Sequence, residues 1–465
     1  MEIMNNNKKA IKSGIYYTLA NFISKGLLLI STPIFARLLT KNEFGDYSNF
    51  TSWMTLALVI VTLNVEASLM SAKYDYSDTY EKYCFSVTLM GSLSTCIWLL
   101  IVNLFSDSFT ELMSMKIKYI NIMLIYILFL AVINVYQSKE QFFYRYKSSI
   151  SIGIINTITT TGLSIALVLY ATNKIQARIV GQCLPTIFIG AILYILMIKK
   201  AKKVDFKSWL YALPICIPYI PHLLSLSILN TSDRIMIQKI CGSEYTALYS
   251  LAYMCGSIIT LLITSMNSAF APWLGEKLYV KDFKGIKKFS YIYILVFVFM
   301  TLGVMLLSPE IMIIMGGEKY MDAVKIMPAI TMGCLCQFLY TLYVDVEQFN
   351  KKTVGMAIAS ISAAILNYIL NLILIPRYGY TAAAYTTLIG YLWLLVVHMF
   401  LVKRIGDIYN NKFVLSVVMG MLFIAFIMIN LYKITIVRYI ITFIYMIASI
   451  IIVILNKDKI RDIIR

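Results

Sequence analysis

The feature that most constrains this chain is a succession of about fourteen apolar stretches, each of roughly twenty residues, separated by short polar segments. A run of ~20 apolar residues is the length at which an α-helix crosses the hydrocarbon core of a bilayer. Hydrophobic residues fill 60% of the 465 positions and charged residues only 14%. A soluble core of this size cannot absorb so much apolar surface. We therefore predict an all-α polytopic membrane protein and not a soluble enzyme.

No connection between these stretches is long enough to fold as a domain of its own. The first twelve spans divide into two groups of six around the basic segment Lys199–Lys207, and the last two look like an appendix. We expect an N-terminal lobe at 1–200, a C-terminal lobe at 201–405, and two additional helices with a tail at 406–465. The expected spans cover approximately residues 11–36, 44–70, 83–105, 117–137, 149–171, 178–198, 208–231, 245–270, 289–308, 323–345, 354–375, 380–402, 413–431 and 435–455.

The net charge of +18 is distributed by loop. Of the 41 lysines and arginines, 27 fall in one alternating set of loops, 13 in the other and one inside the first span. Cytoplasmic loops of membrane proteins carry the excess of basic residues, so both termini are predicted to be cytoplasmic. Charges placed in this way favour a topological role over nucleic-acid binding. Two histidines and eight scattered cysteines show no metal-ligand spacing, so we expect no metal and no cofactor.

The segment Leu213–Tyr253 combines three prolines, an apolar run of helix length and an adjacent Asp–Arg pair. Its three prolines, Pro214, Pro218 and Pro221, remove backbone donors from one span and predict a kinked or partly unwound helix. Broken helices are common hinges and binding sites in transporters, so we expect a hinge here. The end of the segment, EYTALYS at 244–250, echoes EFGDYS at 43–48, which suggests two related lobes that move against each other.

Lys25 is the sharpest single candidate, because it lies near the centre of the first span. A lysine at this depth costs about 2.5–3.5 kcal/mol on insertion scales and should face protein or water. It predicts an anion-binding position in a central cavity, or else a structural partner of Glu66. Glu66 lies near the inner end of the second span and is a candidate for proton or cation coupling, or a partner of Lys25 or Lys73.

Three arginines are further candidates for substrate contact. Arg37 and Arg234 each end a span beside a short outer turn, so each is predicted to be an outer gate or phosphate contact, or an interfacial anchor. Asp233 adjoins Arg234 on the same helix, and helix neighbours do not face each other. The two are therefore predicted to pair with different lobes, as suits a gate that opens and closes. Arg145 lies among aromatic residues of an inner loop and is either a contact for a substrate headgroup or a positive-inside anchor.

Asp345 and Glu347 lie near the end of the tenth span. As intramembrane carboxylates they are candidates for coupling or gating. They also lie close to water, where a carboxylate remains hydrated at little cost, so the alternative is that neither has a role in transport.

Four segments carry a resemblance to a known family: Pro33–Phe50, Leu213–Ile237, Glu244–Tyr253 and Asn371–Tyr385. Together they resemble the polysaccharide flippases (Wzx-like O-antigen or capsule repeat-unit translocases) of the multidrug/oligosaccharidyl-lipid/polysaccharide superfamily. The pattern of an arginine, a leucine-rich turn and then E-F-G-x-Y-S is fairly specific to this group.

The resemblance implies two six-helix lobes around a central cavity, here with two extra helices. It also implies a function, the movement of an undecaprenyl-pyrophosphate-linked oligosaccharide across a bacterial inner membrane, with membrane lipids, a polymerase and a chain-length regulator as partners. Ser24–Lys25 looks similar to a functional Ser-Arg pair of the related lipid II flippases. Those flippases carry a second arginine where this chain has Ser31, so their pyrophosphate site cannot simply be transferred.

Two other functions stay open at this point. A cation-coupled drug exporter would share the fold, although a basic cavity residue disfavours cationic drugs. An enzyme of the same glycan pathway is disfavoured by the short loops, because Asp75 and Asp78 in an inner loop are most simply part of a solvated turn. Whether a proton or a sodium gradient drives transport is likewise open.

Overall fold

The computed structural model describes residues 23–455 except 25, 28 and 144. Throughout this part of the chain the regular elements are helices, and no strand occurs among them. The predicted all-α class is confirmed. Eleven of the described helices are long and apolar enough to cross a membrane. A twelfth span is made by two helices, Lys41–Val61 and Val65–Asp75, which meet at a 48° bend.

Two shorter apolar helices, Leu29–Leu38 and Thr435–Ile447, lie where the first and the last predicted spans were expected. Twelve of the predicted spans therefore correspond to apolar helices of membrane length, and the described parts of the first and the last correspond to shorter apolar helices. The prediction succeeds because a run of apolar residues of membrane length leaves the backbone no alternative to helical hydrogen bonding in lipid.

Backbone contacts divide the chain into two compact units. Unit 1 comprises residues 1–250 and 360–383, and unit 2 comprises residues 251–359 and 384–465. The chain passes between them within α10, α14 and α15. The division into lobes at 1–200 and 201–405 stays a prediction.

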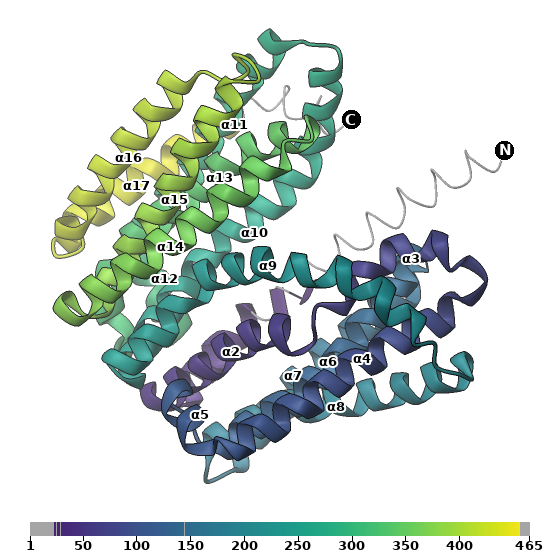
Figure 1. The fold of residues 1–465 in the computed structure, drawn as a ribbon. Coiled ribbons are helices and arrows are strands. Elements are labelled where there is room, and N and C mark those ends of the chain that lie inside the picture. The colour runs from purple at the N-terminus through teal and green to yellow at the C-terminus, as the bar shows by residue number, and fades with distance from the viewer. Residues whose placement is uncertain (1–22, 25, 28, 144, 456–465) are drawn as a thin grey trace. The chain divides into compact units, whose positions relative to one another are not determined.

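Unit 1 contains a bundle in which α6 packs against α2, α4, α7 and α8 (Figure 1). Two apolar clusters support this bundle, one around Tyr83 and Val132 and one around Phe50 and Ile127. Its elements are the helix Leu29–Leu38, α2 (Lys41–Val61), η1 (Val65–Ser68), α3 (Leu69–Asp75), η2 (Ser77–Thr79), α4 (Tyr80–Leu104), α5 (Ser106–Met113), α6 (Ile117–Phe142), α7 (Tyr146–Tyr170), α8 (Lys174–Ala201) and α9 (Lys207–Ile240).

The start of α2 shows how the local sequence sets a helix boundary. Thr40 caps the helix by accepting a hydrogen bond from the Glu43 backbone N–H, and Glu43 accepts one from the Thr40 N–H in return. This reciprocal capping box satisfies two backbone donors that the first helical turn leaves free. The glutamate of the motif EFGDYS therefore has a structural task.

Unit 2 is held together by stacked aromatic rings. Phe297 and Phe338 stack with ring centroids 3.7 Å apart, and Phe270 stacks on Tyr293 at 4.6 Å. Its elements are α10 (Ser243–Tyr279), α11 (Phe283–Leu306), α12 (Ser308–Gly316), η3 (Glu318–Ile326), α13 (Met327–Phe349), α14 (Thr353–Tyr378), α15 (Tyr380–Lys403), α16 (Asn411–Leu431) and α17 (Thr435–Leu455). Of these, α10, α14 and α15 are shared with unit 1.

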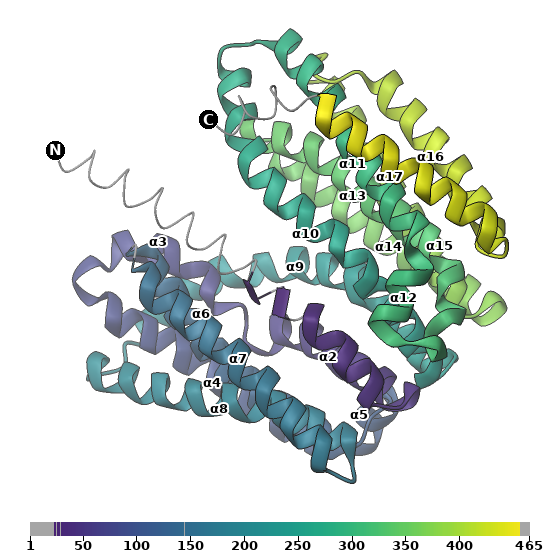
Figure 2. The same ribbon diagram turned by 180° about the vertical axis from the view of Figure 1, so that it is seen from behind.

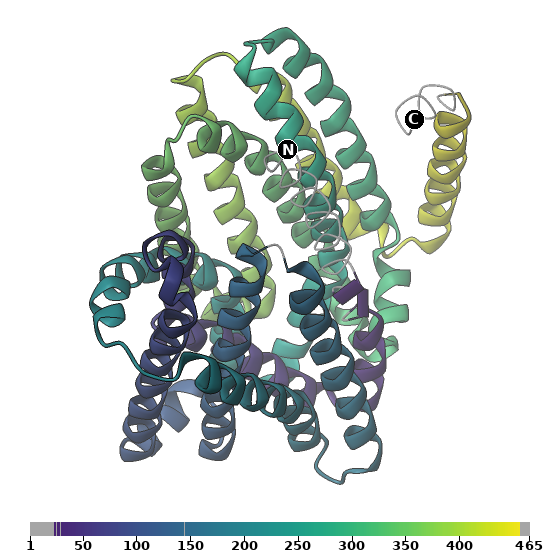
Figure 3. The same cartoon turned by 90° about the vertical axis from the view of Figure 1, so that its right-hand side faces the viewer.

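The last helix, α17, contacts α16 and α11; it is the yellow ribbon nearest the viewer in Figure 2 and the ribbon at the right in Figure 3. Arg438 anchors α17 through two hydrogen bonds of 2.6 Å from its guanidinium to the Glu310 carboxylate of α12. Further along α17, the Tyr445 ring stacks on Phe299. The opposite side of α17 exposes Ile436, Ile440 and Phe443, as expected of a surface that faces lipid.

Candidate functional site

A break in the second span positions Glu66. The helix α2 ends at Val61, and Leu63 and Asn64 adopt left-handed backbone angles before η1 begins. Asparagine tolerates this conformation better than most residues. The chain resumes at an angle, and the carboxylate of Glu66 reaches a cavity inside unit 1. Among the described residues no side chain forms an ion pair or hydrogen bond with this carboxylate.

One face of α6 forms the polar wall of the cavity. Asn134, Gln137, Ser138 and Gln141 recur at positions i, i+3, i+4 and i+7, which places all four on one side of a helix. The preceding stretch of α6, residues 122–133, is apolar. Polar side chains inside a membrane span normally face protein or a water-filled space, and here they face the cavity.

The opposite wall comes from α7 and the first span. Ser149, Ile150, Gly153 and Ile154 of α7 line the cavity, and Ser24 completes it. The Gln137 side-chain amide donates to the Ser149 carbonyl oxygen over 2.9 Å and ties α6 to α7.

The cavity has a volume of about 430 Å³. A second one of about 80 Å³ shares Glu66 and Asn134 with it. The larger volume falls in the ~300–1,000 Å³ range of small-molecule sites. Amides, hydroxyls and one carboxylate can exchange many hydrogen bonds with a hydroxylated ligand.

Lys25, the residue ranked first from the sequence, lies outside the described residues. Its neighbour Ser24 lines the cavity, so the predicted site and the observed cavity fall in the same part of the chain. The alternative partner of Glu66, Lys73, donates a hydrogen bond to the Phe142 carbonyl oxygen over 2.7 Å.

A group of buried charges lies beside the end of α6. Lys139 is only 1% exposed and pairs with Glu81 at 2.9 Å and with Glu140 at 3.6 Å. Arg145 reaches Glu140 at 3.8 Å, but most of its side chain is exposed. The arginine predicted to contact a headgroup is thus available to solvent and attached only loosely to this group.

The outer candidates separate into a buried and a partly open set. Asp233 is 2% exposed and accepts hydrogen bonds from the Tyr249 hydroxyl, at 2.5 Å, and from the Asn371 amide. Its neighbour Arg234 is partly exposed and donates to the Asn230 carbonyl oxygen. Arg37 donates to the Pro33 carbonyl oxygen at 3.4 Å. A gate formed by Asp233 and Arg234 stays a prediction.

The two echoed motifs meet inside unit 1. Lys41 and Glu244 form an ion pair of 2.7 Å, and the Asp46 carboxylate accepts hydrogen bonds from Gln238 and Ser243. At Gly45 an added Cβ would stand 1.8 Å from the Ser243 carbonyl oxygen. Only glycine allows the start of α2 to approach the start of α10 this closely.

Arg178 of α8 is buried without a carboxylate partner in the described part of the chain. Its guanidinium carbon lies 3.6 Å from the ring centroid of Phe35 and 4.4 Å from that of Tyr47. These two cation–π contacts compensate part of its desolvation.

The three prolines of α9 do not interrupt it. The helix runs continuously from Lys207 to Ile240 and curves along its length (Figure 1). Of the two expected outcomes, a kink or local unwinding, the backbone shows bending and no loss of helix. A hinge at Pro214, Pro218 and Pro221 stays a prediction.

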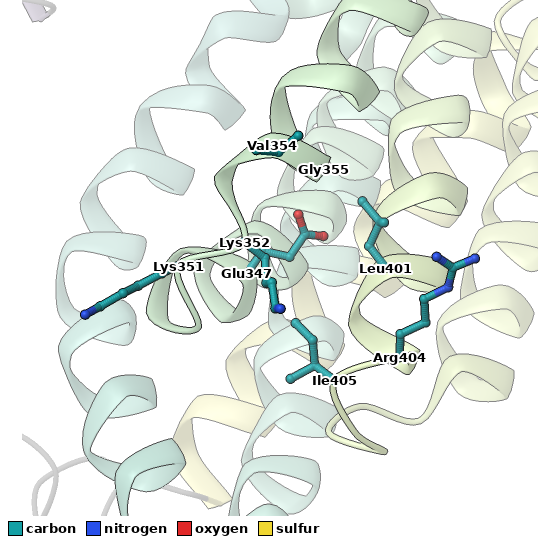
Figure 4. Close-up of a pocket in the computed structure, with 8 residues that line it drawn as sticks. All are labelled: Glu347, Lys351, Lys352, Val354, Gly355, Leu401, Arg404 and Ile405. Carbon is teal, nitrogen blue, oxygen red and sulfur yellow. The ribbon is translucent and has the colours of Figure 1, made fainter.

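In unit 2 the two candidate carboxylates of α13 have different surroundings. Asp345 is 3.5 Å from the Asn267 amide through one oxygen, while the other oxygen has no partner among the described residues. Glu347 lies 2.8 Å from His398 Nδ1 of α15. Figure 4 shows Glu347 at a small cavity lined by basic residues of the neighbouring turns.

Sequence reasoning missed three features of these sites. The amide stripe of α6 is visible as the spacing i, i+3, i+4, i+7 within an apolar run, and a search for polar periodicity would have found it. The pairing of Glu347 with His398 joins residues 51 positions apart. Nothing local in the sequence indicates that contact or the burial of Lys139.

Comparison with known families gives two matches. A family model described as "Polysaccharide biosynthesis protein" matches residues 10–277, which is more than half of the chain. The MatE model matches residues 218–373. A curated relative from Haemophilus influenzae, "Lsg locus putative protein 1", is 20% identical over 86% of this chain and 99% of its own length.

Among solved structures, the lipid II flippase MurJ in an inward closed conformation is similar with a TM-score of 0.71. The alignment covers 96% of this chain and all of that one at 18% identity. A multidrug resistance MATE family transporter in an inward-facing conformation has a TM-score of 0.61 at 15% identity, with 82% of this chain and 94% of that one covered. At these identities the likeness shows a shared fold, that of membrane transporters.

Proposed function

Because the chain belongs to the polysaccharide biosynthesis protein family, within the multidrug/oligosaccharidyl-lipid/polysaccharide superfamily, we propose that it is a flippase for a lipid-linked glycan. Its substrate would be an undecaprenyl-pyrophosphate-linked oligosaccharide, an O-antigen or capsule repeat unit. The protein would move this substrate from the inner to the outer leaflet of a bacterial inner membrane, with both of its own termini in the cytoplasm.

The polar cavity of unit 1 is the single observation that carries this proposal. Its described lining is dominated by amides and hydroxyls, which match the donors and acceptors of a sugar ring. Glu66, without a partner among the described residues, can accept hydrogen bonds from two adjacent sugar hydroxyls. A hydrated passage for the glycan is what a flippase needs, since the polyprenyl tail can remain in lipid.

The pyrophosphate requires cations, and the candidates are Lys25, Arg37, Arg145 and Arg234. Arg37 and Arg145 are exposed and Arg234 is partly so, and Arg145 suits first contact because it lies on the predicted inner side. A lysine at 25 offers phosphate a point charge, whereas an arginine offers a planar fork.

Alternating access would move the substrate past the cavity. Bending at Pro214, Pro218 and Pro221 in α9 would supply the movement. Glu66, Asp233, Asp345 and Glu347 are the carboxylates through which a proton or sodium gradient would act. Asp233 combines a buried carboxylate with the nearby Asn367 and Asn371 amides, an oxygen-rich setting that suits a hard cation.

The test is export of the glycan by a strain that depends on this chain. Asn134→Leu removes an amide from the cavity and should leave lipid-linked repeat units in the inner leaflet and lower surface glycan. Asn121→Leu is the matched control, because Asn121 lies on the same helix α6 but pairs with Asn103 outside the cavity. Wild-type surface glycan in Asn134→Leu and in Glu66→Gln, at normal protein levels, would reject the cavity as the glycan path.

The second candidate is a cation-coupled exporter of small amphipathic drugs. Its supporting observation is that the charged group among the described lining residues of the cavity is the carboxylate of Glu66, which would attract a cationic drug. This function predicts drug resistance on overexpression, lost in Glu66→Gln, with normal surface glycan in a strain that lacks the protein.

A further inference from the structure

Unit 2 buries a carboxylate and an imidazole in contact. Glu347 of α13 and His398 of α15 lie 2.8 Å apart, and their side chains are 1% and 2% exposed. The His398 ring also stacks on Tyr340 with the centroids 5.8 Å apart and the planes within 17°. The tyrosine ring and the carboxylate hold the imidazole in one orientation.

The charge of this pair depends on a single proton. With a neutral imidazole and an ionised carboxylate the pair carries −1, and with one more proton it is neutral as a whole. Burial in a low-dielectric site favours the neutral form. Positive charge in the surroundings acts against this effect of burial.

That opposing influence comes from the cavity beside Glu347. The cavity has a volume of about 370 Å³, and Lys351, Lys352 and Arg404 lie around it. Positive charges favour the ionised form of the pair. In Figure 4 the Glu347 carboxylate points into the space between the first turn of α14 and Leu401 of α15, away from the Lys351 ammonium.

One oxygen of this carboxylate is accounted for and the other is not. Oε1 contacts His398, while Oε2 is fully buried and has no hydrogen-bond partner among the described residues. A buried acceptor left bare costs free energy unless water or a proton satisfies it. The cavity is polar at its rim and large enough for several waters.

The remaining groups around the pair fall into three sets. Tyr340 and Asp345 share α13 with Glu347, Arg404 lies in the turn directly after α15, and Lys351 and Lys352 occupy the turn before α14. The described residues of α14 at the cavity, Val354 and Gly355, bring no charge. Asp345 is two positions from Glu347 and therefore points to another side of the helix.

We propose that Glu347 and His398 form a proton-binding site that exchanges one proton with water in this cavity. The proton arrives in the cavity as hydronium and binds to the pair, held on Oε2 of Glu347 or as the imidazolium of His398, which leaves a water molecule behind; it departs as hydronium when the pair ionises. The cavity lies at the ends of α13 and α15 and the start of α14, which is the predicted inner side, so exchange would occur with the cytoplasm. Coupling of this proton to transport rests on the proposed function, whereas proton binding itself does not.

The chain offers a direct readout because it contains only two histidines. His222→Gln leaves His398 as the single imidazole in full-length protein labelled with ¹⁵N-histidine and reconstituted in lipid nanodiscs. Its ¹⁵N shifts, followed from about pH 5 to about pH 9, should show one titration. Glu347→Gln should move the midpoint to lower pH, because the carboxylate that favours the imidazolium is gone.

Arg404→Ala removes a cation from the cavity and should move the midpoint to higher pH. Lys403→Ala is the matched control, since Lys403 is an exposed neighbour that does not line the cavity, and its midpoint should stay unchanged. A His398 signal constant over the whole range in the wild type would overturn the proposal, as would equal midpoints in wild type and both Glu347→Gln and Arg404→Ala.

The melting temperature of each variant shows that it is folded. His398→Gln, which keeps a donor for Glu347, should fold normally and transport without the pH dependence of the wild type. If His398 titrates as described but no glycan is flipped, the proton site stands and the proposed function fails. If glycan is flipped and His398 does not titrate, only the present inference is lost.

Discussion

The two units treat their intramembrane carboxylates differently. In unit 1, Glu66 follows a break in its helix and faces a cavity of about 430 Å³ with amides and hydroxyls around it. In unit 2, Glu347 sits within an unbroken helix, buried against His398, and lines a smaller cavity that has Lys351, Lys352 and Arg404 around it. The first arrangement leaves a carboxylate available to a ligand, and the second occupies it with an internal partner.

This difference suggests a division of labour. A carboxylate in a polar, roomy setting can change hydrogen-bond partners when a glycan arrives. A buried carboxylate in contact with an imidazole keeps that partner, so the change open to the pair is the gain or loss of a proton. Substrate handling would then belong to unit 1 and proton handling to unit 2. Paired substitutions, taken in order of decreasing effect, compare the units first in packing and ion pairing and then in function, where they test that assignment.

The largest effect is expected from close packing in unit 1. Gly45→Ala places a Cβ 1.8 Å from the backbone oxygen of Ser243, which cannot move without shifting α10, so we expect a loss of at least about 3 kcal/mol. Gly256→Ala in unit 2 meets the Ile330 Cγ2 methyl at 2.6 Å and the Cys334 sulfur at 3.7 Å, and should cost less, about 1–3 kcal/mol, because these are side chains and not backbone. Melting temperature in detergent measures both. Equal decreases in melting temperature for the two variants would mean that both helix pairs accommodate the added methyl group equally well.

The second comparison concerns ion pairs. Lys139→Ala leaves Glu140 buried with only Arg145 near it, at 3.8 Å, and should cost about 2–3 kcal/mol. The estimate is below that for a fully buried pair because Glu81 is 39% exposed. Lys287→Ala in unit 2 breaks a pair with the largely exposed Asp407 and should change stability by less than about 1 kcal/mol. Lys139→Met with unchanged stability would show that packing, and not charge, holds this position.

The third comparison is functional. Glu66→Gln should lower glycan export by about tenfold, or ~1.4 kcal/mol of substrate or transition-state interaction, without changing its pH profile. Glu347→Gln should flatten the pH profile while the affinity for substrate stays near that of the wild type. Export measured in proteoliposomes across pH gives both quantities. If Glu66→Gln removes the pH dependence and Glu347→Gln keeps it, the division of labour is reversed.

The amino-acid sequence alone predicted the helical membrane fold, but it predicted only some of the residues at the candidate sites. Apolar runs of membrane length locate all fourteen helical segments, because the constraint in lipid is local and strong. Glu66 could be selected from its depth in the second span alone. The amide stripe from Asn134 to Gln141 was present in the sequence as a periodicity and was overlooked.

Other features depend on tertiary contacts that no local pattern encodes. His398 looked uninformative as one of only two histidines, and it becomes a candidate only because α15 brings it to Glu347. Glu43 and Glu244 occupy the same place in the echoed motifs, yet one caps its own helix and the other pairs with Lys41. Likeness in sequence therefore indicated a repeat but not the roles of its members.

The smallest expected effect comes from Asp282, a loop carboxylate, and it distinguishes the acid response of that loop from the pH response of Glu347 and His398 in unit 2. Asp282 precedes α11 outside the membrane-spanning helices, and its pKa is lowered from the ordinary value of 3.8 by a hydrogen bond from the Lys277 ammonium and a second from the Gly285 backbone N–H. A lowered folded-state pKa stabilises the protein above the unfolded value and loses that contribution as the pH falls through the folded value. Asp282→Asn keeps the N-cap, so it should lower stability only slightly, and only at a pH above about 4.

This variant sharpens the comparison because the two pH ranges do not overlap. Melting temperatures of the wild type and Asp282→Asn should converge below about pH 4, while the pH profile of export near neutrality should be the same in both. A changed profile near neutrality would mean that the loop before α11, and not Glu347 with His398, contributes to the pH response. An unchanged profile in Asp282→Asn together with a flat one in Glu347→Gln would assign that response to the buried pair, since the loop carboxylate is already ionised throughout the neutral range.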